Sequence, residues 1–496
     1  MTLSLVAPVD LAPAAARMLR RRVLLGFGLL ALVIGYLVYA GLAFGIGDLI
    51  ERARPERALL LGVDSVKHKV HVEQNLRRGG LEVSVEGERT ATYDTPPDWV
   101  VPTGDGARID LGDGYAAVIE GSSVSFTVPG YGTLRARAHE RGVETLLPDG
   151  SVIARPVGDA IESRLADGTV IRHLPDERYE TVTPDGAVIR HPAQTGLADL
   201  LPEGLVPDWA SIREVKLDAR PTVSRRLQIT RTKIEVHRYF WGWENFWFPF
   251  DSVLNGYSWR GLWGLAMSDE RIDPEISNAG FIFRSFWENP DWQHGHVFVA
   301  LLETIMMAVL GTLTAVLLGL PLAFLAARNF TPSMAVRFAV RRVFDFVRGI
   351  DNLIWSLIFI RAFGLGPLTG ALAIAITDTG TLGKLFSEAL ENIDNRQVEG
   401  VRATGAGRLQ RMRFGVLPQI LPVFISQTLY YLEANTRSAT VIGALGAGGI
   451  GLVLVETMRT SKDWENTLYI ISLTIVVVIL MDQLSGWLRR RLIQGG

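Results

Sequence analysis

The chain has 496 residues, of which 48% are hydrophobic and 21% are charged, and its mean hydropathy is +0.21. An apolar balance of this kind beside so many charges predicts membrane spans joined to a polar domain. The net charge of −2 gives no general attraction to nucleic acid, so we expect no nucleic-acid partner. The absence of cysteine excludes disulfides, thiolate metal sites and cysteine nucleophiles.

The N-terminal region predicts a membrane anchor. Residues 1–22 form a tail that ends in three arginines, and residues 23–46 then run without a charge. About 20 apolar residues suffice to cross the hydrocarbon core, whereas the apolar part of a signal peptide has about 7–15. We therefore expect a retained anchor, with a signal peptide as the alternative, and a cytoplasmic tail because of the arginines.

Residues 51–202 are polar, rich in turns and carry an internal repeat at 114–191. Glycines recur every 18 residues, at Gly114, Gly132, Gly150, Gly168 and Gly186, and four of them belong to Asp-Gly pairs. Asp-Gly between β-branched runs predicts hairpins, and a fixed period predicts a stacked array. We expect an all-β antiparallel meander outside the membrane, with two strands per repeat and a thin single sheet as one possible arrangement.

His173 and His191 occupy equivalent places in this repeat. Stacked histidines could bind a metal, but Arg137 and Arg155 hold the same place in earlier repeats. We therefore expect a solvated sheet face and no metal site. For the array as a whole, the functional interpretation is partner binding or self-association.

Residues 203–296 are expected to be a linker followed by aromatic segments at the membrane surface. Seven of the 12 tryptophans fall between Tyr239 and Trp292, where charges and prolines argue against a span. Aromatic rings prefer the headgroup layer of a bilayer. The alternative is an ordinary aromatic core beneath the β domain.

Residues 297–492 predict a helical membrane core. Apolar runs at 297–326, 344–363, 366–386, 414–432 and 466–487 give five spans, so that the anchor brings the total to about six. The large basic clusters then fall on one side, which favours cytoplasmic N- and C-termini. The run at 344–363 is the weakest of the five, because Asp345, Arg348 and Asp351 interrupt it.

A basic segment at 391–418, between two of these spans, has the features of a docking loop. Asp394 can cap a short helix, with Gln397 reaching back to it. Gly405 and Gly407 can end that helix in the left-handed conformation, and a second short helix can follow. A loop built in this way favours a docking surface over a flexible tether.

Glu399, Gly405 and the ending Val416-Leu417-Pro418 resemble the cytoplasmic coupling loop of ABC importer permeases. The flanking residues 381–388, 435–440 and 446–451 are similar to phosphonate-type permeases in particular. Gly400 and Val401 stand where the family motif has two alanines. The resemblance covers residues from about 303 to 492 and the first span.

The resemblance implies a polytopic α-helical protein with a type I ABC importer permease core, into which the β domain is inserted. It implies two ATPase subunits that hold ATP and Mg, a solute-binding protein, and a second permease copy or paralogue in the lipid bilayer of a bacterial inner membrane. The β domain would then be periplasmic or extracellular. The residues that couple to the ATPase would be Glu399, Arg402, Gly405 and Arg408.

By the same resemblance the substrate is phosphonate, phosphite or phosphate, and this chain needs no cofactor of its own. Another small solute, such as methionine, is an alternative. A membrane-anchored β-repeat scaffold or sensor is an alternative of a different class. The chain contains no G-x-x-x-x-G-K-[ST] loop, so we expect a transport subunit without catalytic residues.

Ionisable residues and glycines at membrane depth are candidates for the translocation path or gate. An ionisable residue at the centre of a span costs about 2.5–3.5 kcal/mol on insertion scales, so it tends to face the bundle interior or a water-filled path. Glu433 and Arg437 can pair on one helix face, with simple neutralisation as the alternative role. The candidates are Glu303, Asp378, Glu433, Arg437, Gly446, Gly448 and Gly449.

Gly446, Gly448 and Gly451 also satisfy the G-x-G-x-x-G pattern. An apolar stretch without a preceding strand is the wrong context for dinucleotide binding. We expect these glycines to allow close helix packing or a helix break beside a cavity.

Overall fold

The computed structural model describes residues 12–47, 55–85, 92–192, 194–460 and 463–494. The chain divides into two units, Met1–Gly62 and Val63–Gly496. In the first unit, helix α1 (Ala12–Ala43) contains the apolar stretch Leu24–Ala43, which is long enough to cross a membrane. Helix α3 (Pro55–Asp64) follows and runs into the second unit.

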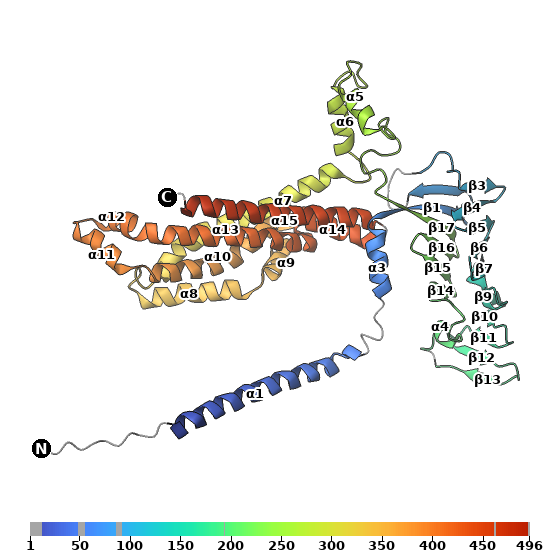
Figure 1. Cartoon of the computed structure of the whole chain (residues 1–496), viewed down its shortest axis with the longest axis horizontal. Helices are drawn as coiled ribbons and strands as arrows, with labels where there is room; N and C mark the ends of the chain where they lie inside the picture. The colour runs from blue at the N-terminus through green and yellow to red at the C-terminus, as the bar shows by residue number, and fades with distance from the viewer. Residues whose placement is uncertain (1–11, 48–54, 86–91, 193, 461–462, 495–496) are drawn as a thin grey trace. The chain divides into compact units, whose positions relative to one another are not determined.

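The described residues from Lys67 to Trp241 build two antiparallel sheets, of six and 11 strands (Figure 1). The larger sheet is a meander in the order β13 to β3, and the smaller has the order β14-β15-β16-β17-β1-β2. The strands are β1 (Lys67–Asn75), β2 (Leu81–Val85), β3 (Val100–Thr103), β4 (Gly106–Gly112), β5 (Tyr115–Glu120), β6 (Ser123–Val128), β7 (Gly132–Ala138), β8 (Val143–Leu146), β9 (Val152–Val157), β10 (Ala160–Arg164), β11 (Val170–His173), β12 (Tyr179–Val182), β13 (Val188–Arg190), β14 (Ala210–Arg213), β15 (Lys216–Thr222), β16 (Arg225–Thr230) and β17 (Lys233–Trp241).

The repeat forms the large sheet, and the predicted antiparallel meander is confirmed. All five repeat glycines have positive φ, from 79° to 121°, and each turn feeds a further strand of the sheet. A cross-strand ladder lies on the outer face of the large sheet, where Arg172 pairs with Glu162 and Arg190 pairs with Glu180, each at 2.8 Å. At the polar position named in the repeat, Arg137 and Arg155 are exposed as predicted, whereas His173 and His191 are half-buried.

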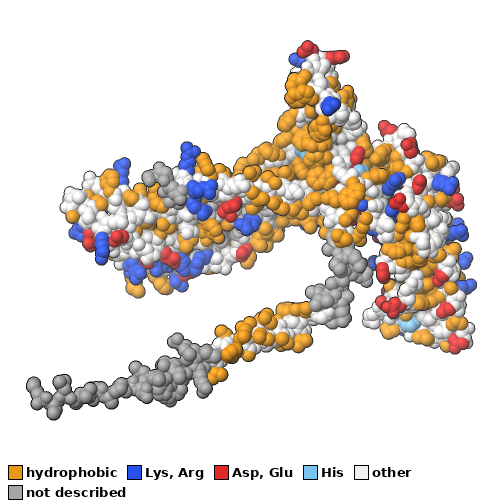
Figure 2. All heavy atoms as spheres, in the orientation of Figure 1, with side chains coloured by type: hydrophobic (Ala, Val, Ile, Leu, Met, Phe, Trp, Pro, Cys, Tyr) orange, Lys and Arg blue, Asp and Glu red, His pale blue; other side chains and the backbone are white. Residues whose placement is uncertain are grey.

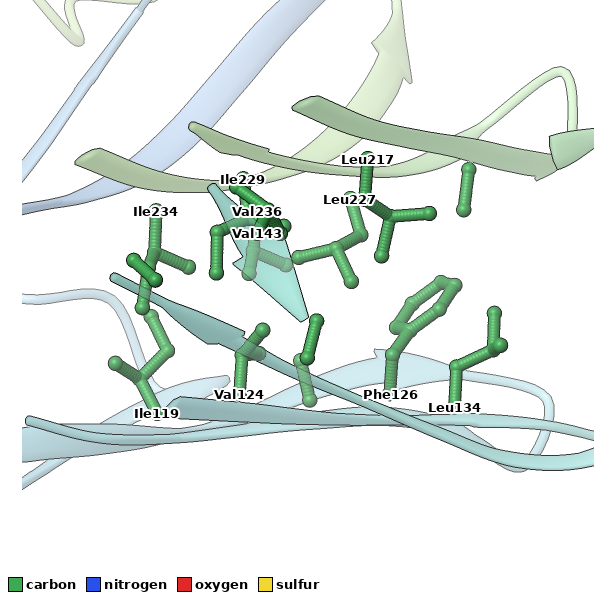
Figure 3. Close-up of a cluster of buried hydrophobic side chains, with 14 of the residues drawn as sticks. Ile119, Val124, Phe126, Leu134, Val143, Leu217, Leu227, Ile229, Ile234 and Val236 are labelled. Carbon is green, nitrogen blue, oxygen red and sulfur yellow. The ribbon is translucent and has the colours of Figure 1, made fainter. Parts of the chain in front are cut away.

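The predicted thin single sheet is wrong, because the two sheets pack face to face over one apolar core. The prediction of a linker from residue 203 is wrong for residues 210–241, which form β14 to β17. Alternating residues of these strands, such as Leu217, Leu227 and Val236, are fully buried against Phe126 and Leu134 of the large sheet (Figure 3). The apolar face of the meander needs this cover.

Two short helices follow the small sheet and form a hairpin. Helix α5 (Trp259–Ala266) and helix α6 (Asn278–Trp287) each begin at a serine whose hydroxyl accepts a hydrogen bond from the third residue on. Leu254 and Leu262 are buried in a small core of their own together with Phe248. Part of the aromatic segment therefore builds a local core. Tyr239 and Trp292 are also buried, whereas Trp241, Trp247, Tyr257, Trp259, Trp263 and Phe283 are exposed.

The remaining helices form a helical bundle and the short helices attached to it. They are α7 (His294–Ala326), α8 (Met334–Gly349), α9 (Asn352–Phe363), α10 (Pro367–Glu391), α11 (Asn395–Ala403), α12 (Arg408–Arg411), η1 (Met412–Val416), α13 (Leu417–Ile442), η2 (Gly443–Ala447), α14 (Gly449–Thr460) and α15 (Trp464–Gln494). Helix α7 packs along α10 and α13. Small residues at these contacts permit the close approach: a Cβ on Gly311 would lie 2.7 Å from Ile374.

Two of the predicted spans, 344–363 and 366–386, are not among the described helices that are long and apolar enough to cross a membrane. Among the described helices, three are long and apolar enough to cross a membrane, α1, α7 and α15, and the bent pair of α13 and α14 gives a fourth. The predicted span at 344–363 is not one helix, because α8 ends at Gly349 and α9 begins after Asp351. The Asp351 carboxylate accepts from the backbone N–H of Leu353 and starts a new helix there.

Candidate coupling surface and translocation site

The predicted docking loop is a helix held against the end of α13. The Asp394 carboxylate accepts from the backbone N–H of Arg396 at 3.0 Å and caps α11 as predicted. The backbone N–H of Asp394 donates to Gln419 Oε1 at 2.8 Å, so the role expected of Gln397 belongs to a residue of α13. Gly405 has φ +84° directly after the helix, which confirms the predicted left-handed end.

The prediction for Gly407 is wrong. Its φ is −67°, and it is the N-terminal cap of α12, where its N–H donates to Gln410 Oε1 at 2.9 Å. The expected second short helix does not stand alone, because α12 continues through the π-turns of η1 into α13. Pro418 is tolerated there because it lies in the first turn of α13.

The outer face of α11 is open to solvent. Glu399, Arg402, Gly405 and Arg408 are all exposed. On the inner side, a Cβ on Gly415 would lie 3.2 Å from Val398 Cα, so the backbone of α11 rests closely on η1. Leu409, which did not stand out in the sequence as a candidate, is 83% exposed beside these residues. The arrangement presents a firm, basic and partly apolar surface that can receive another protein.

Ion pairs fix the entrance to this loop. Arg341 Nη2 of α8 donates to Glu391 Oε1 at 2.5 Å, and the backbone N–H of Arg328 donates to the same oxygen at 2.7 Å. Glu391 therefore ties the end of α10 to the chain between α7 and α8. These bonds hold the end of α10, from which the chain continues into α11.

A buried polar cluster joins three helices inside the bundle. Asn435 of α13 donates to Asp378 of α10 at 2.5 Å and to the Thr312 hydroxyl of α7 at 2.9 Å. All three side chains are buried. Asp378 is a candidate from the sequence, but its partner Asn435 and the Thr312 hydroxyl that Asn435 also contacts are not, since residues so far apart in the chain carry no local signal of contact. Such a cluster fixes the relative position of the helices as long as every hydrogen bond is made.

Glu303 and Thr304 of α7 cap the start of α14. Glu303 Oε2 accepts from the backbone N–H of Gly449 at 3.0 Å, and the Thr304 hydroxyl accepts from the N–H of Ile450 at 2.9 Å. The start of a helix carries unpaired N–H groups and a partial positive charge, so a carboxylate is stabilising there. Glu303 therefore has a structural partner at the break between α13 and α14.

The glycines that precede α14 form the break itself. Gly446, Gly448 and Gly449 have φ values of 109°, 83° and 70°, and the helix axis bends by 58° across them. A Cβ on Gly449 would lie 2.5 Å from the Thr304 hydroxyl, so only glycine fits without a shift. Helices flank this segment on both sides, which agrees with the expected helix break rather than a nucleotide-binding loop.

Residues 319–494 match the family model described as binding-protein-dependent transport system inner membrane component. The phosphite transport system permease protein PtxC of Stutzerimonas stutzeri is 38% identical over 232 residues, which cover 47% of this chain and 78% of PtxC. This chain belongs to that family.

Two further relatives agree with the family assignment. PhnE2 of Escherichia coli K12, which bears the name of a cryptic phosphonate transport system permease, is 50% identical over 122 residues, or 25% of this chain and 99% of PhnE2. The phosphate-import permease protein PhnE of Mycolicibacterium smegmatis is 40% identical over 191 residues, or 38% of this chain. That match spans about a third of the mycobacterial protein, 36% of its length.

Family membership confirms the predicted resemblance to phosphonate-type permeases of ABC importers. The chain is an inner membrane component of a binding-protein-dependent transport system, and therefore a transport subunit rather than an enzyme. The matched residues all lie in the helical core, so the β domain is an addition outside the family model.

In this permease the last pair of candidates, Glu433 and Arg437, lies on α13 with 3.8 Å between the charged groups. The Arg437 side chain is 66% exposed, so the pair contributes little to stability. The structure thus brings Glu303 together with Gly448 and Gly449, and it gives Asp378 a partner on α13, but it leaves Arg437 at an exposed position.

The histidine and carboxylate groups of the β domain that could bind a metal contact protein side chains instead. His173 contacts Glu214, at 2.8 Å, and His191 contacts Thr181, at 2.9 Å. His71, Glu73 and Glu235 lie with ligand atoms within 4.8 Å of one another on the outer face of the small sheet. Lys233 already pairs with both carboxylates, at 3.4 and 2.5 Å, and supplies the cation that they require.

Proposed function

We propose that this chain is the permease subunit of an ATP-driven importer for phosphonate, phosphite or phosphate. The observation that carries the proposal is the exposed face of α11, with Glu399 at its centre and its base fixed to α13. The substrate class follows the names of its relatives, which are phosphite, phosphonate and phosphate permeases. A solute-binding protein outside would deliver the substrate, as the family description suggests.

Two ATPase subunits, which hold ATP and Mg, would bind Glu399, Arg402, Gly405 and Arg408 on the cytoplasmic side. Their closure would push on α11. The push would reach α13 through the close contact between Val398 and Gly415.

Helix α13 would carry this motion into the bundle. At its middle, Asn435 bonds to Asp378 and Thr312, so α7 and α10 would move with it or release it. At its end lie the glycine break and the cap by Glu303. We therefore assign the gate to Glu303, Asp378, Gly446, Gly448 and Gly449.

Arg437 and Glu433 complete the proposed path. An exposed guanidinium on α13 is suited to attract an oxyanion with two or three oxygens, because arginine binds such groups with a fork of N–H donors. A second permease copy or a paralogue would supply the opposite wall of the path.

The proposed topology has about six spans, with both termini cytoplasmic. Residues 23–46 would be the anchor, the sandwich built by residues 67–241 would be periplasmic, and residues 297–492 would be the permease core. Residues 1–22 would be the cytoplasmic tail. The sandwich would bind a partner protein or a second copy.

Reconstitution tests the proposal. The chain is purified together with an ATPase subunit and a solute-binding protein of a phosphonate-type importer, and uptake of radiolabelled phosphonate, phosphite and phosphate into vesicles is measured with and without ATP. Glu399→Ala should abolish uptake while leaving the purified permease folded. Arg437→Ala should reduce uptake and Arg437→Lys should restore part of it. ATP-independent uptake, or normal uptake by both alanine variants, would refute the mechanism.

A further inference from the structure

The hairpin of α5 and α6 is a rigid element rather than a loose loop. The side-chain amide of Asn278 is buried and donates to the carbonyls of Leu265, Ser268 and Glu270, at 3.0, 3.3 and 2.8 Å. These bonds hold the turn between the two helices. With the core around Leu262, they give the hairpin a fixed shape.

The outer face of this hairpin is apolar. Trp259, Trp263 and Phe283 are 65%, 68% and 61% exposed, and Met267 lies exposed beside them. Apolar side chains are visible over this part of the molecule in Figure 2. A surface that remained in water would rarely expose several large aromatic rings together, so the patch indicates an interaction surface.

Direct contacts place the hairpin at the start of helix α7. The Trp287 ring at the end of α6 packs on Phe298 with 5.3 Å between ring centroids, and Phe286 stacks on His294 at 4.0 Å. A Cβ on Gly295 would lie 2.6 Å from Trp287 Nε1, so glycine is needed for this approach. The hairpin therefore stays at the level where α7 begins.

The apolar surface of the hairpin continues onto α7. The first turns of α7 expose Phe298, Val299 and Leu302, and the helix is apolar enough to cross a membrane. In Figure 1, α5 and α6 stand to the side of the end of α7 rather than along its axis. A segment in this position at the end of a span lies at the depth of the membrane–water boundary.

We propose that the α5–α6 hairpin is a membrane-interface anchor, which inserts Trp259, Trp263 and Phe283 between the lipid headgroups and the upper acyl chains. Amphipathic aromatic rings are favoured in this layer. The exposed charges of the connecting loop, Asp269, Glu270 and Arg271, remain on the water side. The occupant of this face is the lipid bilayer, and the anchor fixes the depth of α7 while other helices move.

The test uses the natural absence of cysteine. Single cysteines are introduced by Trp263→Cys and Phe283→Cys, with Glu275→Cys in the exposed loop as the matched control. Each full-length variant carries a nitroxide label in vesicles of phosphatidylethanolamine and phosphatidylglycerol. Collision rates with oxygen, which concentrates in lipid, are compared with those of a water-soluble nickel chelate.

At the two apolar positions the oxygen collision rate should exceed that of the chelate several-fold, and the ratio should reverse at Glu275→Cys. The hairpin is not an anchor if all three labels favour the chelate. The proposal is also refuted if the labels at the apolar positions become protected from the chelate only after the solute-binding protein is added, because the face would then bind protein.

A second measurement tests the same proposal without the cysteine variants, in case one of them fails to fold. Brominated lipids should quench the tryptophan fluorescence of the cysteine-free chain, and the double variant Trp259→Phe with Trp263→Phe should lose a clear part of that quenching. Unchanged quenching would overturn the proposal. Neither experiment uses the ATPase, so its outcome is independent of the proposed transport function.

Discussion

Alanine substitutions at two glycines of the coupling loop should change the stability of α11 in opposite directions. Gly400 lies inside α11 and Gly405 lies just after it with φ +84°. A Cβ at either position would meet no atom within 4 Å, so contacts with neighbours play no part. Gly400→Ala and Gly405→Ala therefore differ only in the backbone conformation that the new side chain must accept.

The magnitudes follow from this difference. In a helix interior, alanine is favoured over glycine by about 0.5–1 kcal/mol, so Gly400→Ala should stabilise α11 by that amount. In the left-handed conformation a Cβ costs about 1–2 kcal/mol, so Gly405→Ala should destabilise the end of α11. For Gly400→Ala, the ratio of folded to locally unfolded α11 should therefore rise by about 2- to 5-fold. For Gly405→Ala, the same ratio at the end of the helix should fall by about 5- to 30-fold.

Hydrogen exchange of the α11 amides, measured by mass spectrometry on the purified chain, reads out both effects. Gly400→Ala should slow exchange in α11 and Gly405→Ala should accelerate it, while exchange in α7 stays unchanged as an internal control. Equal changes in both variants, or faster exchange in Gly400→Ala, would refute the assignment of α11 as a helix ended by a left-handed glycine.

Three further changes test the bundle and the β domain. Asn435→Ala should lower the free energy of unfolding in detergent by about 1–3 kcal/mol, because it leaves the buried Asp378 without its amide partner. Gly449→Ala should lower the unfolding midpoint, because the new Cβ would lie 2.5 Å from the hydroxyl that caps α14, whereas Gly486→Ala meets no atom within 4 Å and should have little effect. Asp218 has a pKa of about 2: burial raises this pKa, but the neighbouring guanidinium outweighs it through hydrogen bonds and charge. Because the folded-state pKa is below the usual 3.8, the stabilisation exists above about pH 4 and is lost as the pH falls towards 2, so Asp218→Asn should flatten the acid dependence of the melting temperature.

Each of these predictions has a contradicting result. An unchanged free energy of unfolding in Asn435→Ala would mean that the buried cluster does not hold the helices. Equal midpoints for Gly449→Ala and Gly486→Ala would remove the steric argument at the glycine break. A steep acid transition that persists in Asp218→Asn would show that other carboxylates control the acid unfolding.

The sequence predicts the β domain as far as its local signals reach. The 18-residue spacing of Asp-Gly pairs identifies the turns, and each repeat glycine has the positive φ that those turns require. The period does not reveal the second sheet, because residues 210–241 lack it. Apolar and polar residues do alternate there: Leu217 and Ala219 flank a polar residue, as do Leu227 and Ile229. This alternation is the signal in the sequence that could reveal those strands.

The coupling loop and the interior show the same limit. Asp394 and Gly405 act within a few residues of their own position, so their roles could be predicted. Gln419 and Asn435 act on residues 25 and 57 positions away, respectively, and no local pattern marks such contacts. Asp351 is visible in the sequence as an interruption of the run at 344–363, but its role as the N-terminal cap of α9 is not.

The central claim is that the exposed face of α11 lies in the cytoplasm and contacts an ATPase. Arg402→Cys in the otherwise cysteine-free chain tests it directly, by labelling with a membrane-impermeant maleimide in intact cells and in inverted membrane vesicles. The account predicts labelling only in inverted vesicles, and protection of the cysteine when the ATPase is bound. Labelling in intact cells would contradict it.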